Sequence, residues 1–201
     1  MVNWTEVDGE TPIDPSMLVD RLRGVVTNRG ELIPLEAENI RKATVKYLGR
    51  PLSRTKAKFD WTWMCEVHRD MFDDVWKWAG VTRKTNLNIG IHHFQVDAQL
   101  LALGETLQYW EANGAPSTIE QAVRLHHRCA EIHPFPNGNG RWSRLLANIW
   151  LHIKKQPLVV WPTGSLEDET DVRSEYLLAL RAADVGSFES LLKLHERYQS
   201  P

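Results

Sequence analysis

The sequence has few cysteines, no long apolar run and no excess of basic residues, and each absence excludes a class of protein. Cys65 and Cys129 are the only cysteines in 201 residues, which is too few for a disulfide framework and fits a reducing compartment. No apolar run reaches the roughly 20 residues of a membrane helix, and the first residues lack the basic and apolar segments of a secretory signal. We therefore expect a cytoplasmic protein that does not enter a membrane.

The charge is nearly balanced, with 24 Lys and Arg against 26 Asp and Glu, a net charge of -2. A protein that binds nucleic acid usually carries a basic stripe, so we expect no nucleic-acid partner. The 9 tryptophans have rings of the kind that stack on bases. Most of them lie in helical patterns without interleaved Lys or Arg, which favours a place in the core.

Helical periodicity with capping signals extends over most of the chain. Asp60 and Asp97 are expected as N-caps, Ser117 and Glu120 fit a capping box, and Gly114 fits a helix stop. The expected helices cover residues 14–23, 34–48, 61–71, 97–113, 118–132, 140–154, 165–183 and 187–198. The pattern predicts an all-α helical bundle. We expect one domain over residues 1–201, with an irregular arm (1–13), N-terminal helices (14–50) and a core (51–201).

Residues 81–96 interrupt the helical pattern. The stretch is rich in Thr, Val and Ile, with Asn and Gly in its middle, and predicts one small β-hairpin. An exposed hairpin edge can take up a segment of another protein as an extra strand, although a plain surface hairpin explains the pattern equally well. His92 and His93 are adjacent, so on a strand they point to opposite faces and do not easily share one metal ion.

The most informative stretch is His133-Pro134-Phe135-Pro136-Asn137-Gly138-Asn139-Gly140-Arg141, followed by Trp142-Ser143-Arg144. A glycine-rich loop that leads into a helix offers backbone N–H groups and the positive end of a helix dipole to an anion. Arg141 and Arg144 are three residues apart, so both can lie on one helix face and bind phosphate oxygens. The imidazole of His133 ordinarily titrates near neutral pH and can accept a proton there. The alternative is a tight turn between two helices.

This stretch resembles the signature of the Fic family, His-x-Phe-x-Asp/Glu-Gly-Asn-Gly-Arg-x-x-Arg, at every fixed position except the acidic one, which is Asn137. Residues 9–15, 27–32, 71–80 and 84–90 are similar to the Fic subgroup called mobile mystery protein B, and residues 173–176 and 179–184 are similar to the usual Fic C-terminal helix. The resemblance implies an enzyme that transfers AMP from ATP to a hydroxyl side chain of a target protein.

The resemblance also implies roles for individual residues. His133 would take the hydroxyl proton, the backbone of Gly138, Asn139 and Gly140 would cradle phosphates, and Arg141 and Arg144 would neutralise the leaving pyrophosphate. Phe135 would be a buried anchor for the loop. The predicted hairpin falls where Fic proteins carry a flap that docks the target, and the flap residues are Lys84, Thr85, Asn86, Asn88 and Ile89.

Asn137 departs from the family at the position whose acid binds Mg²⁺. An amide oxygen can ligate Mg²⁺, but this cation prefers carboxylates, phosphates and water. Three outcomes stay open: weaker dependence on Mg²⁺, a different phosphate-containing donor, or a degenerate domain that binds nucleotide or a protein without turnover.

Two further alternatives concern regulation and chemistry. Fic proteins are often restrained by a helix of pattern Ser/Thr-x-x-x-Glu-Gly/Asn. Residues 34–39, 27–32 and 165–170 match it only in part, which leaves room for a separate antitoxin-like regulator. A metallohydrolase that uses His126, His127 and His133 is disfavoured, because adjacent side chains diverge by about 100° on a helix.

Overall fold

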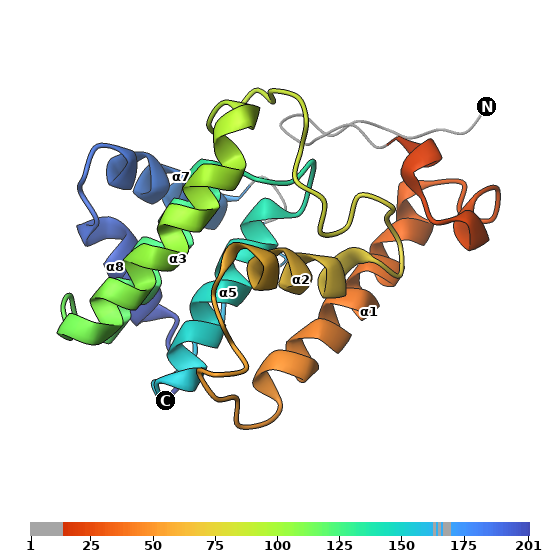
Figure 1. Cartoon of the computed structure of the whole chain (residues 1–201). Coiled ribbons are helices and arrows are strands. Elements are labelled where there is room, and N and C mark those ends of the chain that lie inside the picture. Colours follow the sequence, from red (N-terminus) through yellow and green to blue (C-terminus); the bar gives the residue numbers. More distant parts are fainter. Residues whose placement is uncertain (1–13, 163, 165, 167–169) are drawn as a thin grey trace.

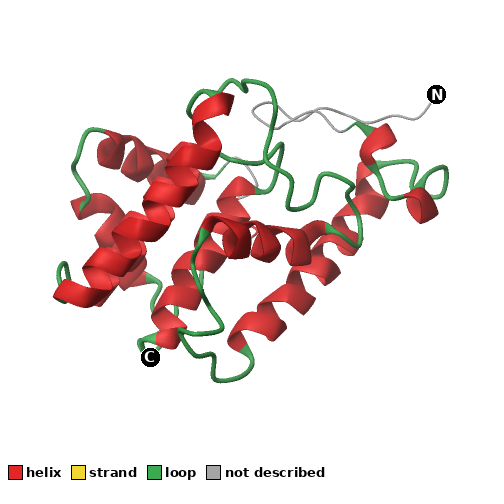
Figure 2. Cartoon of the chain, viewed as in Figure 1, coloured by secondary structure: helices red, strands yellow, loops and turns green. Residues whose placement is uncertain are grey.

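The computed structural model describes residues 14–162, 164, 166 and 170–201, so the expected arm at residues 1–13 lies outside it. The α-helices are α1 (Arg29–Leu48), α2 (Trp61–Phe72), α3 (Val96–Asn113), α4 (Thr118–Ile132), α5 (Asn139–Ile153), α7 (Asp171–Asp184) and α8 (Glu189–Arg197) (Figure 1). Short 3-10 turns lie at Pro15–Met17, Asp20–Leu22 and His93–Gln95. The described residues are helix or loop throughout, and the all-α prediction is confirmed (Figure 2). None of the described helices has the length and apolarity to cross a bilayer.

Local capping explains where most of these helices begin. Asp60 accepts the N–H of Trp63 at 2.8 Å and starts α2, and Ser117 with Glu120 forms the predicted capping box of α4. Gly114 ends α3 in the left-handed conformation, with φ 63°, which suits a residue without a Cβ.

Other boundaries differ from the prediction. Helix α1 begins at Arg29 instead of Pro34, because the side chain of Asn28 accepts the N–H of Glu31 and caps it earlier. Asp97 lies inside the first turn of α3 and is not its cap. Asp14 caps as expected, but only a 3-10 turn follows. Within the range expected as a helix at 165–183, α7 covers Asp171–Asp184, with Thr170 as its cap.

The core lies around α5, which packs against α4, α1 and α2. Trp142 and Trp150 of α5 are fully buried, and Trp63, Trp76 and Trp78 are buried beside them, so the prediction of core tryptophans is confirmed for these five. A second, smaller apolar cluster joins α4 to α7 and α8 through Val123, Tyr176 and Leu191, among others. In Figure 1, α1 and the α7–α8 pair therefore flank the central helices on opposite sides.

The predicted hairpin is wrong, because residues 81–92 contain no strand and follow an irregular path. The carbonyls of Thr85 and Ile91 accept hydrogen bonds from the side chain of Arg83, not from an opposite strand. An isolated two-stranded hairpin is only marginally stable in water. Tertiary contacts of one buried arginine therefore decided the conformation of this segment.

Candidate active site

His133 stands directly after α4 as its C-cap, in the left-handed conformation with φ 50° and ψ 59°. Its Nδ1 lies 3.3 Å from the carbonyl oxygen of Ala130. A carbonyl only accepts hydrogen bonds, so this contact favours the tautomer with the proton on Nδ1, and Nε2 keeps a free lone pair. Burial lowers the pKa of His133 to about 4. The imidazole is therefore a neutral base at neutral pH.

Phe135 and Asn139 fold the signature loop back on itself. The ring of Phe135 is fully buried and stacks on His68, with ring centroids 3.5 Å apart. The side chain of Asn139 donates to the Phe135 carbonyl at 2.8 Å and accepts the Phe135 N–H at 2.9 Å. Asn139 is buried, so its side chain holds the loop while its backbone begins α5.

His68 on α2 is a second support of the loop, which the sequence analysis missed. Its Nδ1 accepts the N–H of Gly80 at 2.9 Å, so its Nε2 carries the proton and donates to the carbonyl of Asn137 at 3.1 Å. Burial lowers the pKa of His68 to about 3, which keeps this tautomer neutral. A lone histidine in an amphipathic helix gives no signal in the sequence that would reveal this contact.

The glycine loop is tight at Gly138, where φ is 80°. A Cβ at this position would lie 2.5 Å from the Phe72 ring, so no other residue fits without displacing α2. The side-chain oxygen of Asn137 accepts the N–H of Gly138 at 2.6 Å. This N–H is therefore engaged within the loop and is not free for a phosphate in this conformation.

The surroundings of Asn137 do not fit a magnesium ion held by the protein. Its amide oxygen already accepts one hydrogen bond, and the described residues contain no group of three or more His, Cys, Asp or Glu side chains that could hold a metal. Mg²⁺ needs near-octahedral oxygen ligands, usually with at least one carboxylate. Any such ion would have to be held chiefly by the phosphates of a bound nucleotide.

The two signature arginines have different partners. Arg141 donates to Glu36 of α1 at 2.9 Å and lies over the ring of Phe72 at 5.0 Å. Arg144 is 8% exposed and lies 5.8 Å over the ring of Tyr176 on α7. The guanidinium group of Arg141 thus contacts α1 and α2, and that of Arg144 contacts α7.

Arg144 also reaches back over the beginning of α5. Its Nη1 would be 3.5 Å from a Cβ on Gly140, in the first turn of the helix. Within the described residues it makes no ion pair, whereas Glu36 neutralises Arg141. An anion at this helix end would therefore meet backbone N–H groups and a guanidinium that has no ion pair among the described residues.

The segment that was expected as a flap lies against the histidine. Lys84, Thr85, Asn86, Asn88 and Ile89 are exposed, while a Cβ on Gly90 would lie 2.5 Å from the Cβ of His133. Asn86 has a local role, since its side chain accepts the N–H of His93 at 3.0 Å. Arg83 also ties this segment to the signature loop through the carbonyl of His133, a contact that the sequence did not predict.

The three histidines of the metallohydrolase reading have separate partners. His126 contacts His195 and Tyr176, each at 2.9 Å, and His127 contacts Asp184 at 2.8 Å. His133 faces Ala130 instead. The three rings therefore have no common point at which they could bind one metal ion, and the geometry does not support a metallohydrolase site.

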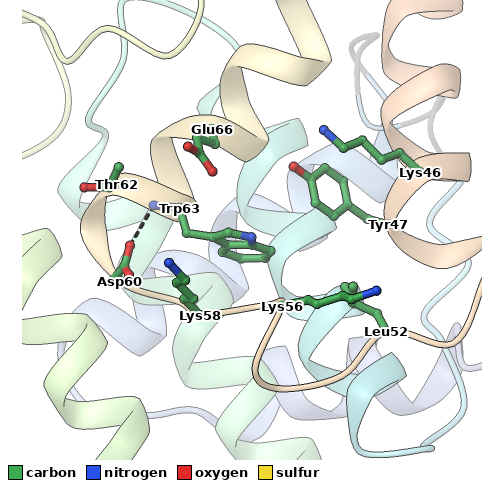
Figure 3. A pocket seen from close by; sticks show the side chains of 9 residues that line it. All are labelled: Lys46, Tyr47, Leu52, Lys56, Lys58, Asp60, Thr62, Trp63 and Glu66. Atoms are coloured by element: carbon green, nitrogen blue, oxygen red, sulfur yellow. Dashed lines mark hydrogen bonds between the residues drawn. The ribbon is translucent and has the colours of Figure 1, made fainter.

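A separate surface cleft of about 550 Å³ lies between α1 and the start of α2. Figure 3 shows Lys46, Lys56 and Lys58 around the indole of Trp63. No residue of the signature lines this cleft, so the size of a cavity alone does not locate the candidate site.

The arrangement is that of a helical protein in which a glycine-rich loop and a neutral histidine lie together between α4 and α5. Residues 58–151 match the model of the Fic/DOC family. This match covers just under half of the chain and includes the whole His133–Arg144 stretch.

Curated relatives that are similar to this chain are protein adenylyltransferases, and the similarity covers only part of their length. The chain is 29% identical over 118 residues to a protein adenylyltransferase Fic of Drosophila grimshawi, an alignment that covers 57% of this chain and 23% of the relative. It is 31% identical over 83 residues to protein adenylyltransferase fic-1 of Caenorhabditis briggsae, covering 41% and 15% of the two chains. The chain thus spans less than a quarter of these relatives.

Solved structures confirm the Fic-like fold. The N-terminal Fic domain of a Bartonella quintana effector superposes with a TM-score of 0.68 at 19% identity, covering 89% of this chain and 87% of that one. BepC of Bartonella tribocorum, solved with bound AMPPNP, gives 0.64 at 18% identity and covers 88% and 90%.

Proposed function

We propose that this protein transfers AMP from ATP to a hydroxyl side chain of a target protein. The observation that carries the proposal is His133, a neutral imidazole with a free Nε2 at the mouth of a glycine loop whose helix end lies beside Arg144. The relatives named as protein adenylyltransferases support it. BepC, whose structure contains the ATP analogue AMPPNP, supports ATP as the co-substrate.

The reaction needs one proton transfer and one displacement. The hydroxyl oxygen of a target Ser, Thr or Tyr attacks the α-phosphorus of ATP, its proton passes to Nε2 of His133, and pyrophosphate leaves. A well-placed general base contributes roughly 10²–10⁴ in rate. The free N–H groups of the loop and the guanidinium of Arg144 would stabilise the charge on the phosphates, and Arg141 would join them after release from Glu36.

The segment 84–91 would dock the target. Among the described residues, none of its backbone N–H groups donates to another backbone carbonyl. An extended target segment could therefore pair with these groups even without a hairpin, and the contact of Gly90 with His133 would bring the target hydroxyl close to the base.

The alternative is a degenerate Fic domain that binds nucleotide or a protein partner without turnover, or that uses another phosphate-containing donor. The observation behind it is Asn137, whose amide oxygen closes on Gly138 at 2.6 Å and brings no negative charge. The variant Asn137→Asp has the same shape and can accept the same N–H. If the missing charge limits the reaction, Asn137→Asp should raise Mg²⁺-dependent labelling by about 10-fold or more, in line with the worth of a metal in transition-state charge stabilisation.

The test is mass spectrometry of the protein and of lysate proteins after incubation with ATP, GTP, UTP or CDP-choline, each with Mg²⁺ or Mn²⁺. We expect an AMP adduct with ATP, its loss in His133→Ala, and its retention in His152→Ala, which alters a histidine at the far end of α5 that contacts Arg50. No adduct with any donor would refute the transfer. Calorimetric binding of ATP without an adduct would favour the degenerate domain.

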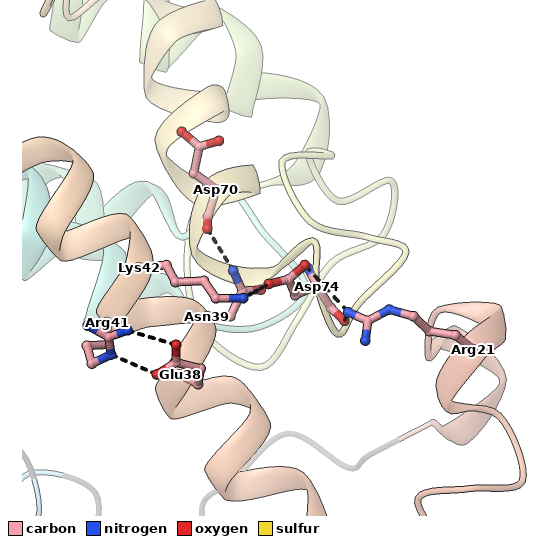
Figure 4. A network of polar contacts seen from close by, with 7 residues as sticks. All are labelled: Arg21, Glu38, Asn39, Arg41, Lys42, Asp70 and Asp74. Carbon is pink, nitrogen blue, oxygen red and sulfur yellow. Dashed lines mark hydrogen bonds and ion pairs between the residues drawn. The ribbon is translucent and has the colours of Figure 1, made fainter.

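Several finer expectations stay predictions. They are the resemblance to the subgroup called mobile mystery protein B, the use of Mg²⁺, the cytoplasmic location, and a single domain over residues 1–201. We also propose a separate antitoxin-like regulator. Its support is that Glu38 is paired with Arg41 on the exposed face of α1 (Figure 4), and Glu31 contacts Thr27, so neither glutamate reaches a signature arginine. The third partial match, at 165–170, lies mostly outside the described residues.

A further inference from the structure

Arg83 is a buried arginine whose described contacts include no carboxylate. It is 4% exposed, and its guanidinium donates to backbone carbonyls of two separate segments. Nε donates to His133 at 2.7 Å and Nη1 to Thr85 at 2.9 Å, while Nη2 donates to Ile91 and lies 3.4 Å from the carbonyl of Ile132. Its own N–H donates to the carbonyl of Pro134 at 2.9 Å.

These contacts suit a cation at the end of α4. The last carbonyls of a helix have no partner inside the helix and form the negative end of its dipole. Arg83 supplies donors to two of them, at Ile132 and His133. A buried charge is costly unless its hydrogen bonds are satisfied, so Arg83 is stable here only while all of these carbonyls stay in place.

The guanidinium of Arg83 also holds the segment 84–91, through carbonyls of that segment. Thr85 lies near one end of the stretch 84–91 and Ile91 forms the other end, and the carbonyls of both accept hydrogen bonds from Arg83. Gly90 completes the contact, because a Cβ there would lie 2.5 Å from the Cβ of His133 and 3.2 Å from Nη2 of Arg83. The segment is therefore held at both ends against the histidine itself.

We propose that Arg83 is a positioning residue that holds the segment 84–91 and His133 in one fixed arrangement, so that a target docked on the segment presents its hydroxyl to the base. The inference rests on the proposed function for its catalytic consequence, but the coupling of segment and histidine stands on the contacts alone. Lysine does not replace arginine here, because an ammonium group lacks the planar fork that reaches four carbonyls.

The first test measures the coupling without any reaction. In the wild type we expect backbone order parameters near ~0.85 for residues 84–91, and in Arg83→Lys values below about 0.6, together with changed ring ¹⁵N shifts of His133. Arg54→Lys is the matched control, because Arg54 also donates to loop carbonyls, at Ala57 and Lys58, with no contact to the signature. An unchanged segment in Arg83→Lys, or equal changes in Arg54→Lys, would overturn the proposal.

The second test measures the reaction. Arg83→Lys should lower kcat for target labelling by about 10²-fold, the effect expected of a displacement of about 1 Å, while calorimetric affinity for ATP stays within about twofold of the wild type. A loss of ATP affinity with unchanged kcat would contradict a positioning role.

If Arg83→Lys does not fold, Gly90→Ala tests the same contact with Arg83 intact, and it should change the His133 shifts and lower kcat. Unchanged shifts and kcat in Gly90→Ala would refute the coupling. A wild type that labels nothing would refute the proposed function, and the order parameters would still decide the role of Arg83.

Discussion

Arg141 and Arg144 stand about one turn apart on α5, and the two sides of the molecule give them different surroundings. On the side of α1 and α2, Arg141 is paired with Glu36, with side chains 22% and 14% exposed. Glu36 also accepts the indole N–H of Trp76 at 2.5 Å. On the side of α7, Arg144 is buried over Tyr176 and has no ion pair within the described residues.

The difference shows that a sequence motif determines which residue stands at a position. It does not determine whether another charged side chain neutralises that residue. A carboxylate at 2.9 Å offsets most of the field that Arg141 would exert on a phosphate. A ring such as that of Tyr176 does not neutralise a cation, and Tyr176 is the partner of Arg144 in the part of the chain that the structure describes. Arg144 should therefore dominate the binding of the phosphates, and Arg141 should contribute in proportion to its release from Glu36.

The largest expected difference between the two sides is their stability in acid. The α7–α8 side holds His126 and His195 in contact, and burial lowers the pKa of His195 to about 3 and that of His126 well below its ordinary value of 6.5. The unfolded chain takes up these protons near pH 6.5, so the stability is complete above that pH and is lost as the pH falls toward 3. At pH 4 the lowered pKa of His195 alone would reduce the free energy of unfolding by about 3 kcal/mol relative to neutral pH.

The α1–α2 side holds one such histidine, His68. Hydrogen exchange between pH 7 and 4.5 should therefore show α8 opening before α2. Equal loss of protection in the two helices would contradict the comparison.

The next effect concerns the arginines themselves. Arg144→Gln should weaken ATP binding by about 30- to 100-fold, since truncating a buried charge that meets a ligand charge costs about 2 kcal/mol or more. Arg141→Gln should weaken it less than about 10-fold, because Glu36 already offsets its charge. Isothermal calorimetry of both variants measures the ratio. A larger loss in Arg141→Gln would reverse our assignment of the two sides.

A smaller gain should follow from the removal of the carboxylate. Glu36→Gln can still accept from Trp76 but no longer neutralises Arg141, so ATP affinity should rise by about 3- to 10-fold, the scale of a half-buried ion pair. Glu38→Gln is the matched control two residues further along α1, because Glu38 contacts only Arg41 among the described partners (Figure 4). Equal gains in both variants would point to net charge and not to the contact with Arg141.

The smallest effect should come from Tyr176. Its hydroxyl contacts His126 at 2.9 Å, and its ring lies under Arg144. Tyr176→Phe keeps the ring and removes one buried hydrogen bond, so thermal unfolding should show a loss of about 1 kcal/mol, with ATP affinity changed by about threefold at most. A loss of affinity as large as that of Arg144→Gln would make the hydroxyl, and not the ring, the support of Arg144.

The sequence predicted features whose causes are local. Asp60, Ser117 and Gly114 mark helix ends because their own side chains or φ angles satisfy nearby backbone groups. The signature loop was also predicted to join two helices, and it does so between α4 and α5. The cap at Asp97 failed because the 3-10 turn at His93–Gln95 starts the helix earlier.

Features that depend on distant residues could not be predicted. Residues 81–92 have the composition of a strand pair, yet Arg83 draws their carbonyls to the end of α4. Likewise, Glu36 and Arg141 are in contact although 105 positions separate them in the chain. The residues next to either one in the sequence do not predict this contact.

The sequence by itself therefore determined the helical class, the helix ends with local caps, and the His133–Arg144 stretch with its glycines, its histidine and its two arginines. The tertiary structure decided that the imidazole of His133 is neutral, that the side chain of Asn137 accepts the N–H of Gly138, and that Arg141, but not Arg144, is paired with a carboxylate of the described residues. The physical reason is that pKa values, tautomers and net local charge follow from burial and from partners brought together by folding, whereas caps and turns follow from the chain within a few residues.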